Sequence, residues 1–261
     1  MGRVAIYQHF RPEEAPLVDE FLELIAQVQT EYRPLLTHFL NPRELYILRT
    51  LLGNNDEVKL QAEGGYENAE RKRALLYPNY YEVELADFEI ALLEIKYPQK
   101  FAQLNHGQIL GTFVNAGLKR NVIGDIVTDG TSWQILVQAN MYNYFQTQIT
   151  KIANIKVQLE LTSLEKVINP LDEWEQVTLT VTSLRLDNLI ATCYHVSRQR
   201  AKELIKNHRV QVNWMLVEKP DYSLESYDIV SVRGHGRIRL DEVLGKSKKG
   251  KLRLSVSILG K

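Results

Sequence analysis

The chain has 261 residues, of which 44% are hydrophobic and 25% are charged, and its formal net charge at pH 7 is zero. This composition is ordinary for a globular protein and excludes a collagen-like or low-complexity chain, while the length favours two or three domains. No apolar run approaches the roughly 20 residues of a membrane-spanning helix, so no membrane partner is expected. The single cysteine excludes an internal disulfide and suits a reducing cytoplasm.

The zero net charge conceals an uneven distribution along the chain. Residues 1–181 carry 16 basic and 24 acidic side chains, a net charge of −8, whereas residues 182–261 carry 16 basic and 8 acidic side chains, a net charge of +8. A short segment with twice as many bases as acids is typical of a module that binds a polyanion. The sequence therefore predicts such a module attached to an acidic body.

The N-terminal part of the chain has a helical pattern. Residues 12–32 place apolar side chains at helical spacing, with acids on the opposite face. Residues 40–55 predict a second helix, for which Asn41 is the N-cap and Gly53 the C-terminal stop. After a Gly-Gly turn, residues 70–74 are interpreted as a short basic helix. Together these elements predict a helical domain over residues 1–75.

The middle of the chain alternates strands and helices in the order β-α-β-β-α-β. The segments are, in turn, 80–98, 100–118, two strands around the hairpin turn Asp129-Gly130, 141–152 and 155–164. This order predicts a ferredoxin-like or RNA-recognition-like domain, a sheet with two helices on one face, over residues 76–180. An acidic linker over residues 169–176 is expected to lead into the last domain. The fold class is therefore α+β, with several domains.

The last domain, residues 181–261, begins with two predicted helices. The first spans residues 183–195, and Ser197 is the expected N-cap of the second. In the second helix Arg198, Lys202 and Lys206 follow one another at four-residue intervals and form one stripe beside an apolar stripe. This helix can therefore pack against a core while it presents its cations. A strand follows over residues 209–214.

At this point the chain resembles a known family of domains. The segment "RLDNLIATCYHVSRQRAKELIKNHRVQVNW" and the later "DYSLESYDIVSVRGHGR" resemble the RNA-binding domain named after ribosomal protein S-four, over about 70 residues. Two positions depart from the usual pattern. Asn207-His208 stands where relatives often have a glycine, and Asn207 is the residue expected to adopt the left-handed conformation there. Trp214 stands where many relatives have the glycine of a hairpin turn.

Over its full length the chain resembles the YlmH family of bacterial ribosome-associated proteins. The motifs that carry this resemblance are "FLNPRELYIL", "GGYENAERKRALLYP" and "GLKRNVIGDI". The resemblance implies a helical N-terminal domain, a central RNA-recognition-like domain and a final S-four-type, αL-like module. It also implies a non-enzymatic cytoplasmic protein that binds structured RNA on the large ribosomal subunit. The family is associated with peptidyl-tRNA on stalled subunits, that is, with ribosome-associated quality control.

The expected RNA-binding residues belong to the last domain. They are Arg185, Ser197, Arg198, Arg200, Lys202, Lys206, Arg209, Asn213, Arg233, Gly234, Gly236, Arg237 and Arg239. The run "RGHGR" (233–237) is equally compatible with a backbone nest that binds a phosphate and with a glycine-assisted strand end. Secondary contacts with RNA or a protein partner are expected from Arg71, Lys72, Arg73, Lys119 and Arg120. The alternative for this second set is exposed charge at a domain-closing turn.

Other functions receive less support from the sequence. A pseudouridine synthase would use Asp187 as its catalyst, but only 74 residues follow it, too few for the catalytic sheet. A methyltransferase would need a glycine-rich loop after a strand, and none is present. The six histidines lack metal-ligand spacing, so no metal and no cofactor are expected. The expected partners are rRNA of the large subunit, tRNA and ribosomal or quality-control proteins, bound by a monomer. An adaptor that docks a protein on its acidic body stays an alternative.

Overall fold

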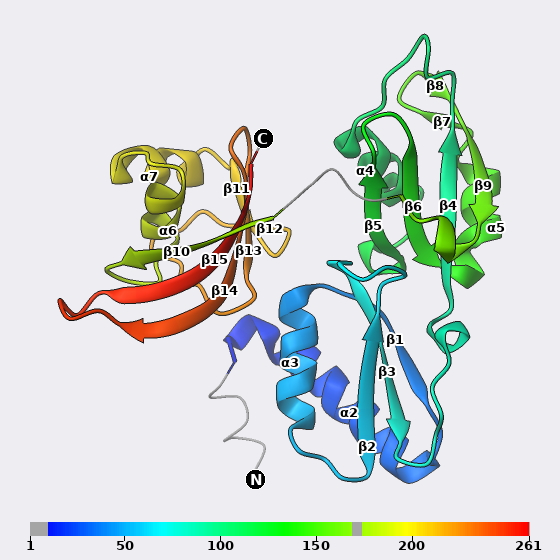
Figure 1. The fold of residues 1–261 in the computed structure, drawn as a ribbon, viewed down its shortest axis with the longest axis horizontal. Coiled ribbons are helices and arrows are strands. Elements are labelled where there is room, and N and C mark those ends of the chain that lie inside the picture. The colour runs from blue at the N-terminus through cyan, green and yellow to red at the C-terminus, as the bar shows by residue number, and fades with distance from the viewer. Residues whose placement is uncertain (1–9, 169–173, 261) are drawn as a thin grey trace. The chain divides into compact units, whose positions relative to one another are not determined.

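The computed structural model describes residues 10–168 and 174–260. The described chain falls into two units, residues 1–171 and 172–261, each with its own sheets and core (Figure 1). Most of the linker expected over residues 169–176 lies outside the described residues. The mixture of helices and strands confirms the α+β, multidomain fold class.

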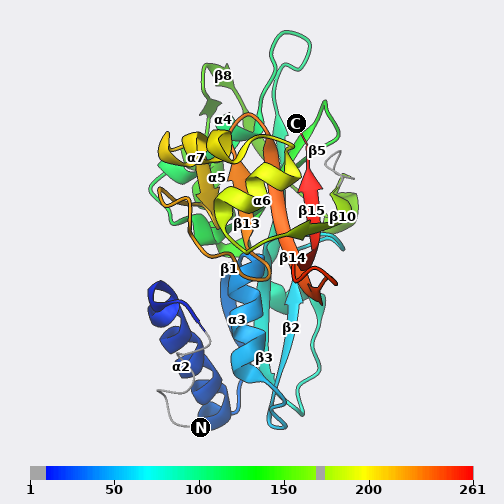
Figure 2. The same cartoon turned by 90° about the vertical axis from the view of Figure 1, so that its left-hand side faces the viewer.

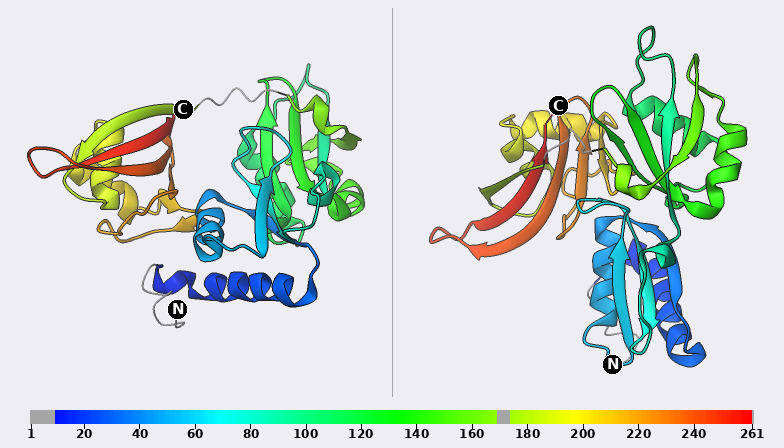
Figure 3. Two further views of the ribbon diagram at one scale, coloured as in Figure 1. Left: turned by 60° about the horizontal axis from the view of Figure 1, so that its bottom comes forward. Right: turned by 45° about the vertical axis from the view of Figure 1, so that its right-hand side comes forward.

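The N-terminal part of the first unit combines two helices with a small sheet. After a single 3-10 turn, η1 (Pro12–Glu14), come α2 (Ala15–Glu31) and α3 (Pro42–Leu52), which confirm both predicted helices. They share one core with an antiparallel sheet of order β1-β3-β2, which the sequence did not predict (Figure 3). Its strands are β1 (Leu35–Leu40), β2 (Val58–Glu63) and β3 (Lys72–Pro78).

The interpretation of residues 70–74 as a basic helix is wrong. Residues from Lys72 onward form β3, the central strand of the sheet, which pairs with β1 on one side and β2 on the other. Ala74, Leu75 and Leu76 are buried there. Arg, Lys, Ala and Leu favour a helix locally, but pairing on both edges and burial on both faces override that preference.

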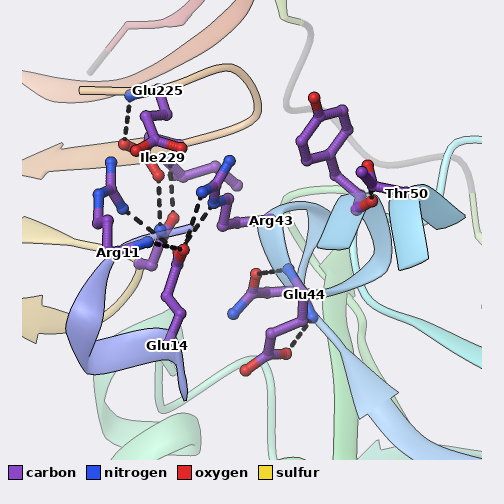
Figure 4. Close-up of polar contacts among 11 residues, drawn as sticks. Arg11, Glu14, Arg43, Glu44, Thr50, Glu225 and Ile229 are labelled. Atoms are coloured by element: carbon purple, nitrogen blue, oxygen red, sulfur yellow. Dashed lines mark hydrogen bonds and ion pairs between the residues drawn. The ribbon is translucent and has the colours of Figure 1, made fainter. Parts of the chain in front are cut away.

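Capping contacts fix the start of α3 and explain why the chain turns there. The Asn41 side chain accepts a hydrogen bond from the Glu44 backbone N–H at 2.9 Å, and the Glu44 carboxylate accepts one from the Asn41 N–H at 2.7 Å (Figure 4). This reciprocal pair is a capping box, which satisfies two orphan donors of the helix. Close by, the Glu14 carboxylate accepts hydrogen bonds from both the Nε and Nη2 atoms of Arg43 at 2.9 Å. The predicted N-cap is thus confirmed.

The central part of the first unit has the predicted β-α-β-β-α-β order. The six elements are β4 (Ile90–Lys96), α4 (His106–Asn115), β5 (Ile123–Thr128), β6 (Trp133–Gln138), α5 (Tyr142–Gln148) and β9 (Gln158–Thr162). The sheet is antiparallel with the order β5-β6-β4-β9. A two-stranded hairpin, β7 (Lys151–Ile152) and β8 (Ile155–Lys156), is inserted before β9. The short 3-10 turns are η2 (Leu85–Phe88), η3 (Arg120–Val122), η4 (Ala139–Met141) and η5 (Leu164–Lys166).

Buried polar contacts join the two parts of the first unit. The Asp125 carboxylate on β5 accepts hydrogen bonds from the Tyr66 hydroxyl at 2.8 Å and from the backbone N–H groups of Glu70 at 2.7 Å and Arg71 at 3.1 Å. Burial, together with the nearby charge of Glu70, raises the pKa of this carboxyl. The segment between the Gly-Gly turn and β3 is therefore tied to the central sheet by one carboxylate.

The second unit contains a six-stranded antiparallel sheet of order β10-β15-β14-β13-β11-β12. Its strands are β10 (Glu175–Val181), β11 (Val210–Val212), β12 (Met215–Leu216), β13 (Ile229–Val232), β14 (Gly236–Lys246) and β15 (Leu252–Leu259). Two helices, α6 (Leu186–Cys193) and α7 (Arg198–Lys206), lie over one face of the sheet (Figure 2). Apolar side chains of both helices and of five strands form the core between them. Strand β3 runs across the domain boundary predicted at residue 75, and β10 runs across the one predicted at residue 180.

The two departures from the S-four-type pattern are accommodated by left-handed residues that are not glycine. His208, with φ of 54°, takes the left-handed conformation after α7, so the expectation for Asn207 is wrong by one residue. The Arg209 N–H then closes the helix end on the Leu204 carbonyl at 3.1 Å. Asn213 and Trp214, with φ of 48° and 64°, form the two-residue turn between β11 and β12. Two positive φ values are what a two-residue hairpin turn requires.

Replacing Asp125 by Asn should lower the stability of the first unit by about 1–3 kcal/mol. The asparagine amide has only one acceptor oxygen for the three donors that bind the Asp125 carboxylate. Its NH2 group would face another donor, so at least one buried donor loses its acceptor. Hydrogen exchange of the amides in β3 and β5, measured on the full chain, reports this change. Glu160→Gln, at an exposed carboxylate, is the control. Equal protection of β3 in both variants would show that Asp125 does not hold the two parts together.

Candidate nucleic-acid interface

A fully buried carboxylate organises two arginines at the starts of α6 and α7. Asp187 is 0% exposed, yet the Arg185 and Arg198 side chains beside it are 38% and 50% exposed. Arg185 forms a bidentate contact with Asp187, in which Nε lies 3.1 Å from Oδ1 and Nη2 lies 3.1 Å from Oδ2. Arg198 does the same from the other helix, with Nε 3.2 Å from Oδ2 and Nη2 3.4 Å from Oδ1. One negative charge thus holds two positive ones, and the cluster keeps a net positive charge.

The local backbone explains why these three residues meet. Arg185 is the N-cap residue of α6, which places Asp187 in the first turn, where a negative charge interacts favourably with the helix dipole. The backbone N–H of Asp187 donates to the Pro220 carbonyl at 3.0 Å, which fixes the start of α6. Arg198 opens α7, because the Ser197 hydroxyl accepts a hydrogen bond from the Arg200 N–H at 3.1 Å. Ser197 is therefore the N-cap of α7, as predicted, and its hydroxyl has a structural role.

The electrostatics of the cluster favour the ionised carboxylate. Burial acts to raise the pKa of Asp187, but the hydrogen bonds from Arg185 and Arg198 outweigh it, so the pKa lies below its ordinary value. The hydrogen bonds that Arg185 donates to Asp187 in turn raise the pKa of the Arg185 guanidinium. The ionised carboxylate therefore lies between two guanidinium groups, whose N–H groups not turned toward Asp187 can bind another anion.

Helix α7 carries the predicted stripe of cations along the side away from the core. Ala201, Leu204 and Ile205 are at most 2% exposed and face the core, as expected. Lys206 is exposed and Lys202 is half-buried. Arg200 is exposed but forms an ion pair with Glu203 at 3.1 Å.

The turn between β13 and β14 favours the strand-end interpretation of "RGHGR". Two of the backbone N–H groups that a nest would offer to a phosphate are already used. Arg233 N–H donates to the Arg209 carbonyl at 2.8 Å, and His235 N–H donates to the Val232 carbonyl at 2.9 Å. Gly236 is required by close packing, because a Cβ there would lie 2.1 Å from the Leu259 carbonyl oxygen. Arg209 and Arg233 themselves are exposed and extend the basic surface beyond α7.

Arg237 and Arg239 lie on the other face of the sheet. Ile238 between them is fully buried in the core under the helices, so its two neighbours on the strand point the opposite way. The Arg237 guanidinium stacks between two indoles, 5.4 Å from the ring centre of Trp174 and 5.8 Å from that of Trp214. Arg239 also stacks on Trp174, at 5.3 Å, and its Nε donates to Asp241 at 2.6 Å. The RNA-binding residues predicted from the sequence therefore lie on two faces of this sheet. Arg237 and Arg239 are on the face away from the helices.

Asn213 is held inside the second unit. Its Nδ2 donates to the Asp228 carboxylate at 2.8 Å, and its Oδ1 accepts from the Ile229 N–H at 3.0 Å. The same carboxylate accepts a hydrogen bond from the Glu225 N–H at 2.9 Å (Figure 4). Because both ends of its amide are occupied, Asn213 acts as a turn-forming residue, which differs from the predicted RNA contact.

Three of the five predicted secondary contacts point inward. Arg71 and Arg73 are 4% and 5% exposed. Arg71 donates to the carbonyls of Phe39 and Ile123, and Arg73 to those of Thr37, Phe88 and Glu89. Arg120 donates to the carbonyls of Ile123 and Gly124. Guanidinium groups engaged in this way hold the chain together, so the prediction that they contact RNA or a partner does not fit their positions. Lys119 is exposed and Lys72 half-buried.

Other chemistry finds no support in the described part of the chain. No group of three or more His, Cys, Asp or Glu residues there could hold a metal ion. Cys193 is buried on α6, and burial raises the pKa of its thiol to about 12, which makes it an inert core side chain. Among the described helices, none is long and apolar enough to cross a membrane.

Two features of the second unit were not found from the sequence. The first is the role of Asp187 as the shared partner of two arginines, although its spacing from Arg185 in the motif Arg-Leu-Asp could have suggested one of these contacts. The stacking of Trp174 and Trp214 on Arg237 brings together three residues far apart in the chain. No local sequence pattern predicts that contact.

Comparisons with known proteins find relatives for both units of the chain. Three family models match: "YlmH, N-terminal" over residues 13–81, "Putative RNA-binding domain in YlmH" over 84–166, and "S4 domain", the S-four-type module, over 184–230. A Bacillus subtilis protein named "Ribosome-associated protein quality control protein P2" is 42% identical over 250 residues, which cover 96% of this chain and 97% of that protein. A solved structure titled "Cell division protein ylmH from Streptococcus pneumoniae" is similar with a TM-score of 0.54 and 38% identity, covering 62% of this chain and 99% of that one.

The carboxyl of Asp187 should titrate below the ordinary value of 3.8, and Arg198→Gln should raise its pKa by removing one of the two guanidinium partners. Because the folded-state pKa is lowered, the stability that this cluster contributes is present above about pH 4 and is lost as the pH falls through the folded value. Carboxyl-carbon NMR of the full chain measures both titrations. The same Asp187 pKa in the wild type and the variant would mean that Arg198 does not bind this carboxylate in solution.

Proposed function

The chain belongs to the YlmH family, and from that premise we propose that it binds structured rRNA of the large ribosomal subunit, and tRNA with it, through its S4 domain. It acts as a ribosome-associated quality-control factor on stalled complexes that carry peptidyl-tRNA. The family models support RNA binding, and the printed name of the Bacillus subtilis relative supports the ribosomal setting.

The observation that carries the proposal is the pair of arginines fixed by Asp187. A guanidinium held in one orientation by a buried carboxylate offers its remaining N–H groups to a phosphate without first losing side-chain freedom. Two such groups lie at the starts of α6 and α7, and Lys202 and Lys206 continue the surface along α7. We call these four residues the helix-side surface; Arg209 and Arg233 extend it.

This surface suits recognition of RNA by shape. Cations that contact phosphates supply affinity and placement, whereas sequence is read at base edges. The deep, narrow major groove of an RNA helix hides those edges, so a stem or a junction is recognised mainly through its backbone. The same phosphate chemistry is presented by rRNA and by tRNA. Both are therefore proposed ligands of the helix-side surface.

The buried position of Asp187 argues against catalysis. In a pseudouridine synthase this aspartate would have to reach a uridine, but here it is 0% exposed and both of its oxygens bind arginines. We propose a non-catalytic protein of the bacterial cytoplasm, without a cofactor, that works as a monomer. Incubation with bulk rRNA, followed by assays for pseudouridine and for transfer of a methyl group, tests whether the chain is catalytic. Light scattering of the purified chain tests whether it is a monomer.

An adaptor role is a second candidate, favoured by the net charge of −8 over residues 1–181. In that role the first unit docks a ribosomal or quality-control protein while the S4 domain holds RNA. Lys72 and Lys119, the two secondary candidates whose side chains are not anchored inward, are its testable contacts. Pull-down with the full chain and with a Lys72→Glu, Lys119→Glu variant separates a protein contact from RNA binding.

The double variant Arg198→Gln, Lys202→Gln should weaken binding to purified large subunits and to competitor RNA alike. The logarithmic salt slope should fall by about 0.7–0.9 for each lost phosphate contact. Binding measured over a range of salt concentrations gives the slope. Lys248→Gln, Lys249→Gln removes the same charge from the exposed β14–β15 turn and is the control. Equal slopes for the two variants would show that α7 does not face RNA.

Asp187→Asn should weaken RNA binding by roughly ten-fold, the equivalent of about 1.4 kcal/mol. The substitution makes the protein more positive, so long-range attraction alone predicts tighter binding. Weaker binding is expected because Arg185 and Arg198 lose the group that orients them. Asp221→Asn, an exposed acid that influences the pKa of Arg185, is the matched control with the same change of charge. Tighter binding by both variants would contradict the orienting role.

A further inference from the structure

The central sheet has one face that its helices do not cover. Along β6, Ile135 and Val137 belong to the core under α4 and α5, so Leu136 and Gln134 point to the opposite face. RNA-recognition-type domains leave that face open and stack bases on its aromatic side chains. Here Leu136 and its neighbour Leu92 on β4 are 0% exposed. Something other than a helix must cover them.

Two segments of the same unit cover this face. Gly65 lies against it so closely that a Cβ there would be 2.3 Å from Leu136 Cδ2 and 3.2 Å from Leu164 Cδ2. The Gln134 amide holds the segment after β9, donating to the Lys166 carbonyl at 3.0 Å and accepting from the Ile168 N–H at 2.9 Å. The face that RNA-recognition domains use for bases is therefore filled by the chain's own Gly-Gly turn and its η5 segment.

One end of the central domain combines cations with an exposed aromatic ring. Phe101, in the loop after β4, is 89% exposed, more than any other large hydrophobic side chain in the described residues. Lys100 precedes it, and Lys151 and Lys156 pair across the exposed β7–β8 hairpin. The loop and the hairpin lie at the same end of the domain in the views of Figures 1 and 3. We call Lys100, Phe101, Lys151 and Lys156 the loop end.

Pairing within the sheet ties both parts of the loop end to rigid strands. Lys96, where β4 ends and the loop begins, is the register partner of Gln158, which follows the hairpin. Lys96 itself is paired with Glu94. The Tyr97 hydroxyl donates to the Thr131 carbonyl at 2.9 Å, which holds the base of the loop against the β5–β6 turn. The base of the loop that carries Lys100 and Phe101 is therefore held by the sheet.

We propose that the loop end binds an unpaired segment of RNA, with Phe101 stacking on a base and the three lysines contacting phosphates. This inference rests on the proposed function and adds a second RNA contact to it. An aromatic side chain beside a positively charged track is the arrangement by which proteins bind single-stranded nucleic acid without reading sequence. The exposed lysines at this end of the domain favour phosphates over an apolar protein partner. The covered sheet face removes the stacking platform that RNA-recognition-type domains use.

Binding of the full chain to a 5′-labelled oligouridine of about twelve nucleotides and to deproteinised large-subunit rRNA tests the inference. Phe101→Ala should weaken both by roughly 5- to 150-fold, the range for loss of one base–aromatic stack. Phe101→Trp should restore binding, whereas Phe101→Leu, which keeps an apolar side chain without a ring system, should not. Since Phe101 is exposed, none of these changes disturbs a core.

The outcomes separate this inference from the proposed function. Unchanged RNA binding by Phe101→Ala, with weaker binding by Arg198→Gln, Lys202→Gln, overturns the loop end and leaves the helix-side surface intact. Weaker binding of Phe101→Ala to whole subunits but not to deproteinised rRNA also overturns it, because the partner is then a protein. No binding of the wild-type chain to either RNA would overturn both proposals.

Discussion

The surface of the second unit depends on one buried negative charge. Asp187 is inaccessible to solvent and could not stay ionised there without the two guanidinium groups that bind it. The arginines, in turn, would be flexible surface side chains without the carboxylate. Each helix start supplies one arginine, so the same contact that orients the cations also fixes α7 against α6. The cluster of Asp187, Arg185 and Arg198 therefore both stabilises the packing of the two helices and orients cations that can bind a polyanion.

The first unit uses its arginines in the opposite way. Arg71, Arg73 and Arg120 direct their donors to main-chain carbonyls between elements, and Asp125 accepts from the segment before β3. The Gly65 turn and the η5 segment cover the central sheet on the side where RNA-recognition-type domains bind bases. The RNA contact that we propose for this domain, whose family model is described as "Putative RNA-binding domain in YlmH", therefore uses another surface. The loop end carries Phe101 and three exposed lysines, Lys100, Lys151 and Lys156.

Regular patterns made much of this fold predictable, and long-range contacts account for most of what was not. The helices α2 and α3, the Asn41 cap and the β-α-β-β-α-β order follow from spacing and turn residues that lie close together in the chain. The N-terminal sheet was missed because β3 is rich in residues that favour helices and becomes a strand only through its two neighbours. The sequence identified the basic residues but not their exposure: Arg71 and Arg198 occur in similar basic runs, and only the fold buries one and displays the other.

The central claim is that Arg185 and Arg198, held by Asp187, contact RNA. A cryo-EM map of the full chain bound to purified large ribosomal subunits tests it most directly. The account predicts that both guanidinium groups lie within hydrogen-bond distance of phosphate oxygens, about 2.7–3.2 Å, while their contacts with Asp187 persist. A map in which the chain is bound but these two arginines face solvent or a ribosomal protein would contradict it.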